Sequence, residues 1–175
     1  MAAETAVAAK STTRVSPIKV KKIGHLVYKV SDVDRSVKFW TEVMGFTVSD
    51  RNEFGMVFLR TNADHHTIAV VPGKAEHRPE GGLQVDHLAL EVGTIDELVA
   101  ARDYLRSQGV PVVWEGRRGP GGNPGIHCHD PDGYDFELYC DMDQIDERGR
   151  SRPPSQWSRA GSLEEAIAKP LPKAW

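Results

Sequence analysis

The sequence predicts an α+β domain of two β-α-β-β-β modules that form a curved mixed sheet around a cleft, with the helices outside. The main observation is an internal repeat. GHLVYKVSDVDRSVKFWTEVMGF has the same pattern as DHLALEVGTIDELVAARDYLRSQGV, with His25 matching His87 and Gly45 matching Gly109. Each half predicts a strand, a capped helix and then short strands separated by turn residues. The 175 residues are enough for one domain with a core and too few for two ordinary ones.

The first module is expected at residues 20–73. Its first strand is predicted from Ile23 to Val30, which is dense in β-branched residues, and Ser31-Asp32 then caps a helix. Apolar residues recur at helical spacing until Gly45, which ends the helix. Three more strands are expected, at residues 46–50, 56–60 and 66–71.

The second module is expected at residues 83–141 and follows the same plan. A strand at 84–92 leads to the capping box Thr94-Ile-Asp-Glu97, which opens a helix that Gly109 ends. The remaining strands are expected at residues 110–114, 126–129 and 134–140. A Gly-rich loop precedes the last two strands, and its arginines, Arg117 and Arg118, are expected to be exposed.

The two ends of the chain have a different composition from the modules. Residues 1–18 lack a sustained apolar period, which predicts a flexible arm. Residues 142–175 are polar and Pro-rich, and Ser162-Leu-Glu-Glu165 predicts a short helix there. We expect this extension to lie against the domain or a partner subunit through Trp157, Ile167 and Trp175.

The charge balance excludes some classes of partner. The 22 basic and 25 acidic residues sum to −3, which does not favour nucleic-acid binding. No apolar run approaches the roughly 20 residues that span a bilayer, and the first residues lack the pattern of a secretory signal. We therefore expect a cytoplasmic protein with no membrane partner.

Three residues are candidate metal ligands. His25 and His87 occupy matching places on the first strand of each module, so a pseudo-twofold arrangement would bring the two imidazoles together. Glu137 lies in the last strand between apolar residues, where a lone carboxylate is costly to bury. A single His or Glu on a strand is more often just hydrogen-bonded or solvated, but three at repeat-related places favour a metal site. Two histidines and one carboxylate are typical of non-haem Fe(II) sites, and Mn(II) accepts the same ligands.

The paired His-Leu strands and the motif Asp-Pro-Asp-Gly-x-x-x-Glu-Leu at residues 130–138 resemble the vicinal oxygen chelate superfamily. The resemblance covers residues 20–141. This superfamily contains glyoxalase I, fosfomycin-resistance proteins, epimerases, antibiotic-binding proteins and type I extradiol dioxygenases, so the fold does not choose the reaction.

Details of the resemblance favour the extradiol dioxygenases. The glyoxalase branch commonly has a fourth, carboxylate ligand, and Ala69 stands at that place. The stretch Asp64-His-His-Thr-Ile-Ala69 is similar to the motif that carries the dioxygenases' acid/base histidine, which implies this role for His66. His65 would point to the opposite face. His127 stands where these enzymes usually carry a Tyr that contacts substrate oxygen. It either donates the same hydrogen bond or indicates a different substrate or reaction.

The resemblance therefore implies an Fe(II)-dependent extradiol dioxygenase that acts on a small aromatic diol and dioxygen. Single-domain members commonly associate, so it also implies a homodimer or a larger homo-oligomer. One alternative is a metal-dependent lyase, isomerase or thiol transferase of the glyoxalase or fosfomycin-resistance kind. The other is a metal-free resistance protein that binds an aromatic ligand.

Overall fold

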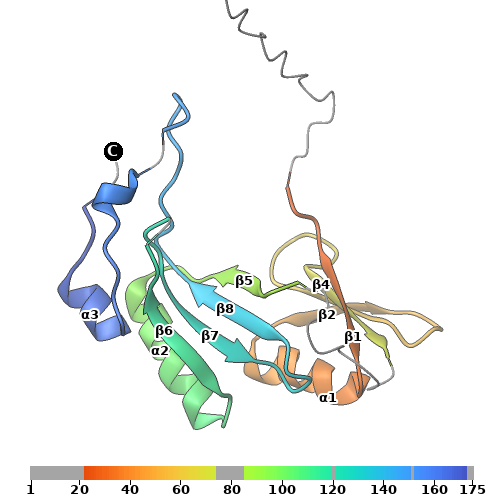
Figure 1. Ribbon diagram of the computed structural model, residues 1–175. Coiled ribbons are helices and arrows are strands. Elements are labelled where there is room, and N and C mark those ends of the chain that lie inside the picture. Colours follow the sequence, from red (N-terminus) through yellow and green to blue (C-terminus); the bar gives the residue numbers. More distant parts are fainter. Residues whose placement is uncertain (1–21, 74–84, 120, 151, 173–175) are drawn as a thin grey trace, which may run out of the picture.

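The computed structural model describes residues 22–73, 85–119, 121–150 and 152–172, which form two four-stranded mixed sheets (Figure 1). The strand orders are β1-β4-β3-β2 and β5-β8-β7-β6. In each sheet the first and last strands of the module pair in parallel, and the other pairs are antiparallel. The two predicted β-α-β-β-β modules are confirmed. The predicted arm at residues 1–18 and Trp175 lie outside the described residues.

The first module begins with a strand and a helix that changes pitch. Its elements are β1 (Leu26–Val30), α1 (Val33–Lys38), the π-helical turn η1 (Phe39–Val43), β2 (Thr47–Arg51), β3 (Val57–Arg60) and β4 (Ile68–Pro72). Asp32 caps α1 by accepting a hydrogen bond from the backbone N–H of Arg35. The sequence predicted one continuous α-helix, but its second half is a π turn, a form that apolar spacing does not distinguish.

The second module follows the predicted order closely. Its elements are β5 (Leu88–Glu91), α2 (Ile95–Ser107), β6 (Val112–Arg117), β7 (Pro124–His129) and β8 (Asp135–Tyr139). The capping box is confirmed, because Thr94 accepts a hydrogen bond from the N–H of Glu97 and Glu97 accepts one from the N–H of Gly93. Gly109 then adopts a φ of +74°, which only glycine takes up readily.

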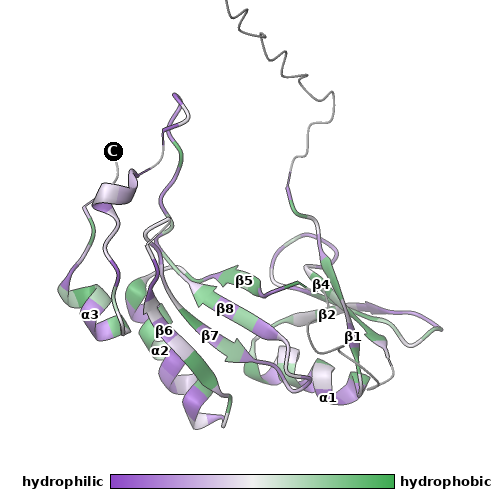
Figure 2. Cartoon of the chain, in the orientation of Figure 1, coloured by the Kyte–Doolittle hydropathy of each residue, from purple (hydrophilic) through white to green (hydrophobic). Residues whose placement is uncertain are grey.

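The hydrophobic core joins the two modules. Trp40 is fully buried and contacts the rings of Tyr28, Phe46 and Phe136, so an aromatic residue of the first module packs on β8 of the second. Figure 2 shows hydrophobic residues along the strands and a mixture of hydrophobic and hydrophilic residues in α2, whereas the loop after β8 is largely hydrophilic.

A polar lock also joins the modules. Asp132, in the turn between β7 and β8, accepts hydrogen bonds from the backbone N–H and hydroxyl of Ser31 and from the guanidinium of Arg35. The hydroxyl of Tyr134 donates to the carbonyl of Lys29 at 2.9 Å. The start of β8 is thereby held against the end of β1.

The C-terminal strap, residues 152–172, runs along the outer edge of the second sheet and contains η2 (Pro154–Gln156) and α3 (Leu163–Ala168) (Figure 1). Arg117 and Ala160 exchange two backbone hydrogen bonds, and the Arg117 side chain donates to the carbonyls of Ser158 and Lys169. Arg117 is only 3% exposed, so the expectation that it is exposed is wrong: the strap covers it.

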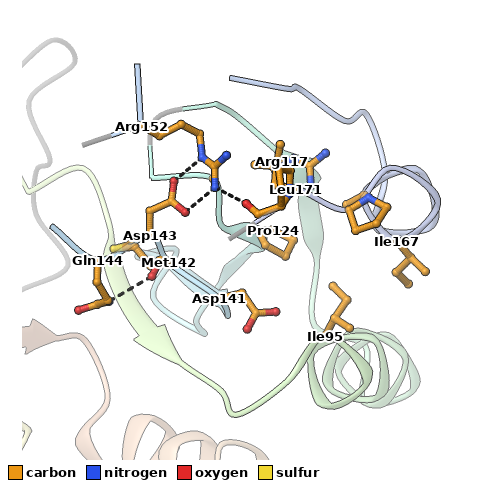
Figure 3. A pocket seen from close by; sticks show the side chains of 14 residues that line it. Ile95, Arg117, Pro124, Asp141, Met142, Asp143, Gln144, Arg152, Ile167 and Leu171 are labelled. Atoms are coloured by element: carbon orange, nitrogen blue, oxygen red, sulfur yellow. Dashed lines mark hydrogen bonds and ion pairs between the residues drawn. The ribbon is translucent and has the colours of Figure 1, made fainter. Parts of the chain in front are cut away.

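The predicted helix of the extension is confirmed as α3, with Ser162 accepting a hydrogen bond from the N–H of Glu165. Contact with the domain is made by fully buried Leu163, while Ile167 and Trp157 stay partly exposed. A cavity of about 540 Å³ lies beneath the strap. Figure 3 shows side chains that line it, among them Arg152, which donates twice to Asp143. Among the described residues, no helix combines the length and apolar character needed to cross a bilayer.

Candidate metal centre

Three side chains of the second module converge on the face of its sheet opposite α2. His87, His127 and Glu137 each place one potential ligand atom within 4.8 Å of the others. Strand register explains the cluster: His127 pairs directly with Glu137 across β7 and β8, and Ala89 pairs with Glu137 across β5 and β8. His87 immediately precedes β5, and its Nε2 reaches Glu137 on this side of the sheet.

Both histidines of the cluster are oriented by carboxylates. Nδ1 of His87 lies 2.7 Å from Oδ2 of Asp86, and Nδ1 of His127 lies 3.1 Å from Oδ1 of Asp135. A carboxylate accepts hydrogen bonds and fixes the proton of a neutral histidine on Nδ1, which leaves Nε2 free to bind a metal. Indeed, Nε2 of His87 is the atom that faces Glu137, 3.4 Å from its Oε2.

The Glu137 carboxylate has few partners for a group that is largely buried. Its side chain is 12% exposed, and the amide of Asn123 donates to Oε1 over a long 3.4 Å. Gly125 makes room for it, since a Cβ there would lie 2.5 Å from Oε1. Because an ionised carboxylate is costly to bury without a cation, this donor set fits a divalent metal ion.

His25, the third predicted ligand, is not part of this group of three. It is exposed just before β1, and its ring is 4.3 Å from that of His66. The structure thus brings together two of the three predicted ligands, His87 and Glu137, and adds His127. His25 as a ligand stays a prediction.

The predicted acid/base residue, His66, lies beside His25 on the first module. Burial, followed by the charges of His25 and His65, holds the pKa of His66 below its ordinary value. His65 does not point to the opposite face as expected. Its Nδ1 is 3.0 Å from Nδ1 of His66, and both rings contact Phe58, because β4 begins only at Ile68 and strand alternation does not apply before it.

Ala69 occupies the place in the first module that Glu137 has in the second. Ala69 pairs with Val27 across β1 and β4, as Glu137 pairs with Ala89 across β5 and β8. The alignment of the two modules is therefore borne out by strand register, and the fourth carboxylate is absent from this position.

A cavity of about 430 Å³ lies between the modules and adjoins the cluster. His87 and Asp135 line it from the second module, and Tyr28 and Tyr134 supply aromatic walls. Its mixture of aromatic walls and a few convergent polar groups is typical of small-molecule sites.

Asp86 and Asp135, the two carboxylates that orient His87 and His127, were not predicted from the sequence. Strand alternation could have found Asp135, since it lies two residues before Glu137 and shares its face. Asp86 carries no such signal, because it adjoins His87 in the sequence outside any strand.

Comparison with known proteins identifies the family of this chain. The sequence pattern of the Glyoxalase/Bleomycin resistance protein/Dioxygenase superfamily matches residues 22–138, more than half of the chain. A manganese-dependent 2,3-dihydroxybiphenyl 1,2-dioxygenase of Geobacillus genomosp. 3 is 28% identical over 129 residues, which is 72% of this chain and 38% of that protein. A probable lactoylglutathione lyase of Vibrio parahaemolyticus is 33% identical and is matched over 88% of its length, by 67% of this chain.

Among solved structures, the fosfomycin-resistance protein FosX of Listeria monocytogenes superposes with a TM-score of 0.56 at 17% identity, over 70% of this chain and 94% of that one. This similarity supports the fold alone. The chain spans about half, or less, of the length of the dioxygenases it matches.

Proposed function

Because this chain belongs to the Glyoxalase/Bleomycin resistance protein/Dioxygenase superfamily, we propose that it is a metal-dependent dioxygenase that cleaves a small aromatic diol beside its two hydroxyl groups. The observation that carries the proposal is the cluster of His87, His127 and Glu137 beside an aromatic-walled cavity. Fe(II) is the proposed metal and Mn(II) the alternative, since both accept histidine and carboxylate ligands.

Within this proposal, His87 and Glu137 hold the ion, with His25 as the third ligand that the motif predicts. A divalent ion supplies charge that favours ionised diol oxygens and a place where diol and dioxygen meet. The cavity holds the aromatic ring between the modules, with Tyr28 and Tyr134 as its walls.

His66 is the proposed acid and base. Its Nδ1 lies against Nδ1 of His65, so Nε2 is the atom that would take a proton from a diol hydroxyl and later return it. Alanine at position 69 supports this reading over a four-ligand lyase, because the place matching Glu137 offers no carboxylate.

A metal-dependent lyase is the second candidate function, which the 33% identity to the probable lactoylglutathione lyase favours. Oxygen consumption distinguishes the two functions. A dioxygenase consumes oxygen in proportion to substrate, whereas a lyase turns over without consuming oxygen.

The test is reconstitution with Fe(II) or Mn(II) without air, followed by catechol, 3-methylcatechol or 2,3-dihydroxybiphenyl with oxygen. We expect oxygen uptake and a coloured ring-fission product. His66→Ala should keep its metal and lose about 10²–10⁴ in turnover. Absence of both oxygen uptake and a coloured product across the whole panel would refute the proposal.

A further inference from the structure

We propose that His127 is itself a metal ligand, and not the hydrogen-bond donor that the sequence predicts, with Asp135 as the positioning residue that aims it. This inference rests on the proposed metal centre and changes its ligand set. It makes the second module able to hold the ion through its own His87, His127 and Glu137.

The position of His127 restricts what its ring can do. It is 5% exposed, lies directly across the strand pair from Glu137, and has its ring 4.8 Å from that of His87. Trp114 closes another side, with ring centroids 5.5 Å apart. The imidazole therefore faces the two proposed ligands at close range.

The partner of Nδ1 determines what His127 offers at Nε2. Asp135 accepts a hydrogen bond there at 3.1 Å, and an ionised carboxylate has no proton to donate in return. In its neutral form His127 must therefore carry its proton on Nδ1, so Nε2 presents a lone pair. A lone pair binds a metal and cannot donate to a substrate oxygen.

The same arrangement recurs at the neighbouring ligand. Asp86 holds Nδ1 of His87 at 2.7 Å, and Nε2 of His87 faces Glu137. Both histidines therefore have Nδ1 against a carboxylate, and both have a ligand atom within 4.8 Å of Glu137. Metal-binding histidines are commonly held by outer carboxylates in this way.

The first experiment uses the wild-type protein. The full chain, labelled with ¹⁵N at its histidines, is titrated with Zn²⁺ as a diamagnetic probe, and long-range ¹H–¹⁵N spectra report each imidazole. We expect Nε2 of both His87 and His127 to shift on binding. If His87 and His25 shift while His127 does not, the inference is overturned and the metal centre stands. If no histidine shifts, both fail.

Variants provide the second readout, Zn²⁺ affinity by calorimetry. His127→Gln keeps an N–H donor but loses the imidazole, and we expect it to weaken binding by more than about 100-fold, beyond the 10–100-fold typical of a lost outer carboxylate. Asp135→Asn should weaken binding about 10–100-fold and alter the ¹⁵N signature of the His127 tautomer, which a merely structural change would not do.

The matched control is His129→Gln, two residues along β7 on the same face, which should bind Zn²⁺ like wild type. Circular dichroism and the thermal midpoint verify that each variant is folded. Wild-type affinity in folded His127→Gln would show that His127 is only a hydrogen-bonding group.

Discussion

Removing the Asp132 carboxylate should weaken the contact between the two modules and lower the free energy of unfolding. Oδ1 of this residue accepts from the backbone N–H of Ser31 at 3.0 Å, from its hydroxyl, and from Nη2 of Arg35 at 2.9 Å. The Asp132 side chain is largely buried, whereas Arg35 is half exposed. This lock holds the turn before β8 against the end of β1, beside the cavity that adjoins the cluster.

The magnitude follows from these partners. Hydrogen bonds to charged groups contribute about 1.5–3 kcal/mol each, but they share one oxygen here and are not additive. The half-exposed ion pair adds only about 0–1 kcal/mol. We expect Asp132→Ala to lower the free energy of unfolding by about 2–3 kcal/mol, and Asp132→Asn, which keeps an oxygen for Ser31, by about 1 kcal/mol.

The effect should depend on pH. Burial raises the pKa of Asp132, but the bonds from Ser31 and Arg35 outweigh it and hold that pKa below its ordinary value of 3.8. The carboxylate therefore contributes its full stability above pH 3.8, and the contribution is lost as the pH falls through the folded-state pKa.

Urea denaturation of wild type, Asp132→Ala and Asp132→Asn at about pH 7 and about pH 3 measures this, with the exposed Glu147→Gln as control. The difference in free energy of unfolding between wild type and Asp132→Ala should become smaller at low pH. The free energy of unfolding of Glu147→Gln should equal that of wild type at both pH values. A cost below about 0.5 kcal/mol, or a cost independent of pH, would refute the reasoning.

Three further changes test other parts of the structure. Gly125→Ala places a Cβ 2.5 Å from Oε1 of Glu137, so Mn²⁺ affinity by calorimetry should fall about 10–100-fold, whereas Gly24→Ala, with open space around it, should not change it. Trp40→Ala should cost about 3–5 kcal/mol in urea denaturation, because its side chain is fully buried. Arg152→Met removes the ion-pair partner of the partly buried Asp143, so limited proteolysis should cut the strap faster, while Mn²⁺ affinity stays at the wild-type level.

The fold was predictable because its signals are local and repeated. Capping boxes, glycine stops and apolar period each determine a short segment, and the match of His25 with His87 showed that one plan occurs twice. The π turn at Phe39–Val43 was not predictable, since apolar spacings of three and four residues suit either helix type.

The site was predictable only in part, because it depends on relations between strands. The repeat matches His25 with His87 and Ala69 with Glu137, and in the structure Glu137 pairs with Ala89, two residues after His87. The repeat does not predict that His25 lies against His66, because this contact depends on where β4 begins. Arg117 was misjudged for a similar reason: a distant segment, the strap, covers it.

The two possible ligand sets can be separated at Ala69, the first-module counterpart of Glu137. Ala69 is fully buried, so Ala69→Glu should destabilise the metal-free protein by several kcal/mol, on the order of the cost of an unpaired buried carboxylate. If the ion lies between the modules with His25 as a ligand, the new carboxylate reaches it, and Mn²⁺ should raise the thermal midpoint more than in wild type.

If the second module alone holds the ion through His127, the new carboxylate stays unpaired, and Mn²⁺ should raise the midpoint of Ala69→Glu no more than that of wild type. Ala69→Gln serves as the control, since it adds similar bulk without charge. A larger Mn²⁺ shift in Ala69→Glu than in Ala69→Gln would place His25 back in the ligand set and contradict a centre built on one module.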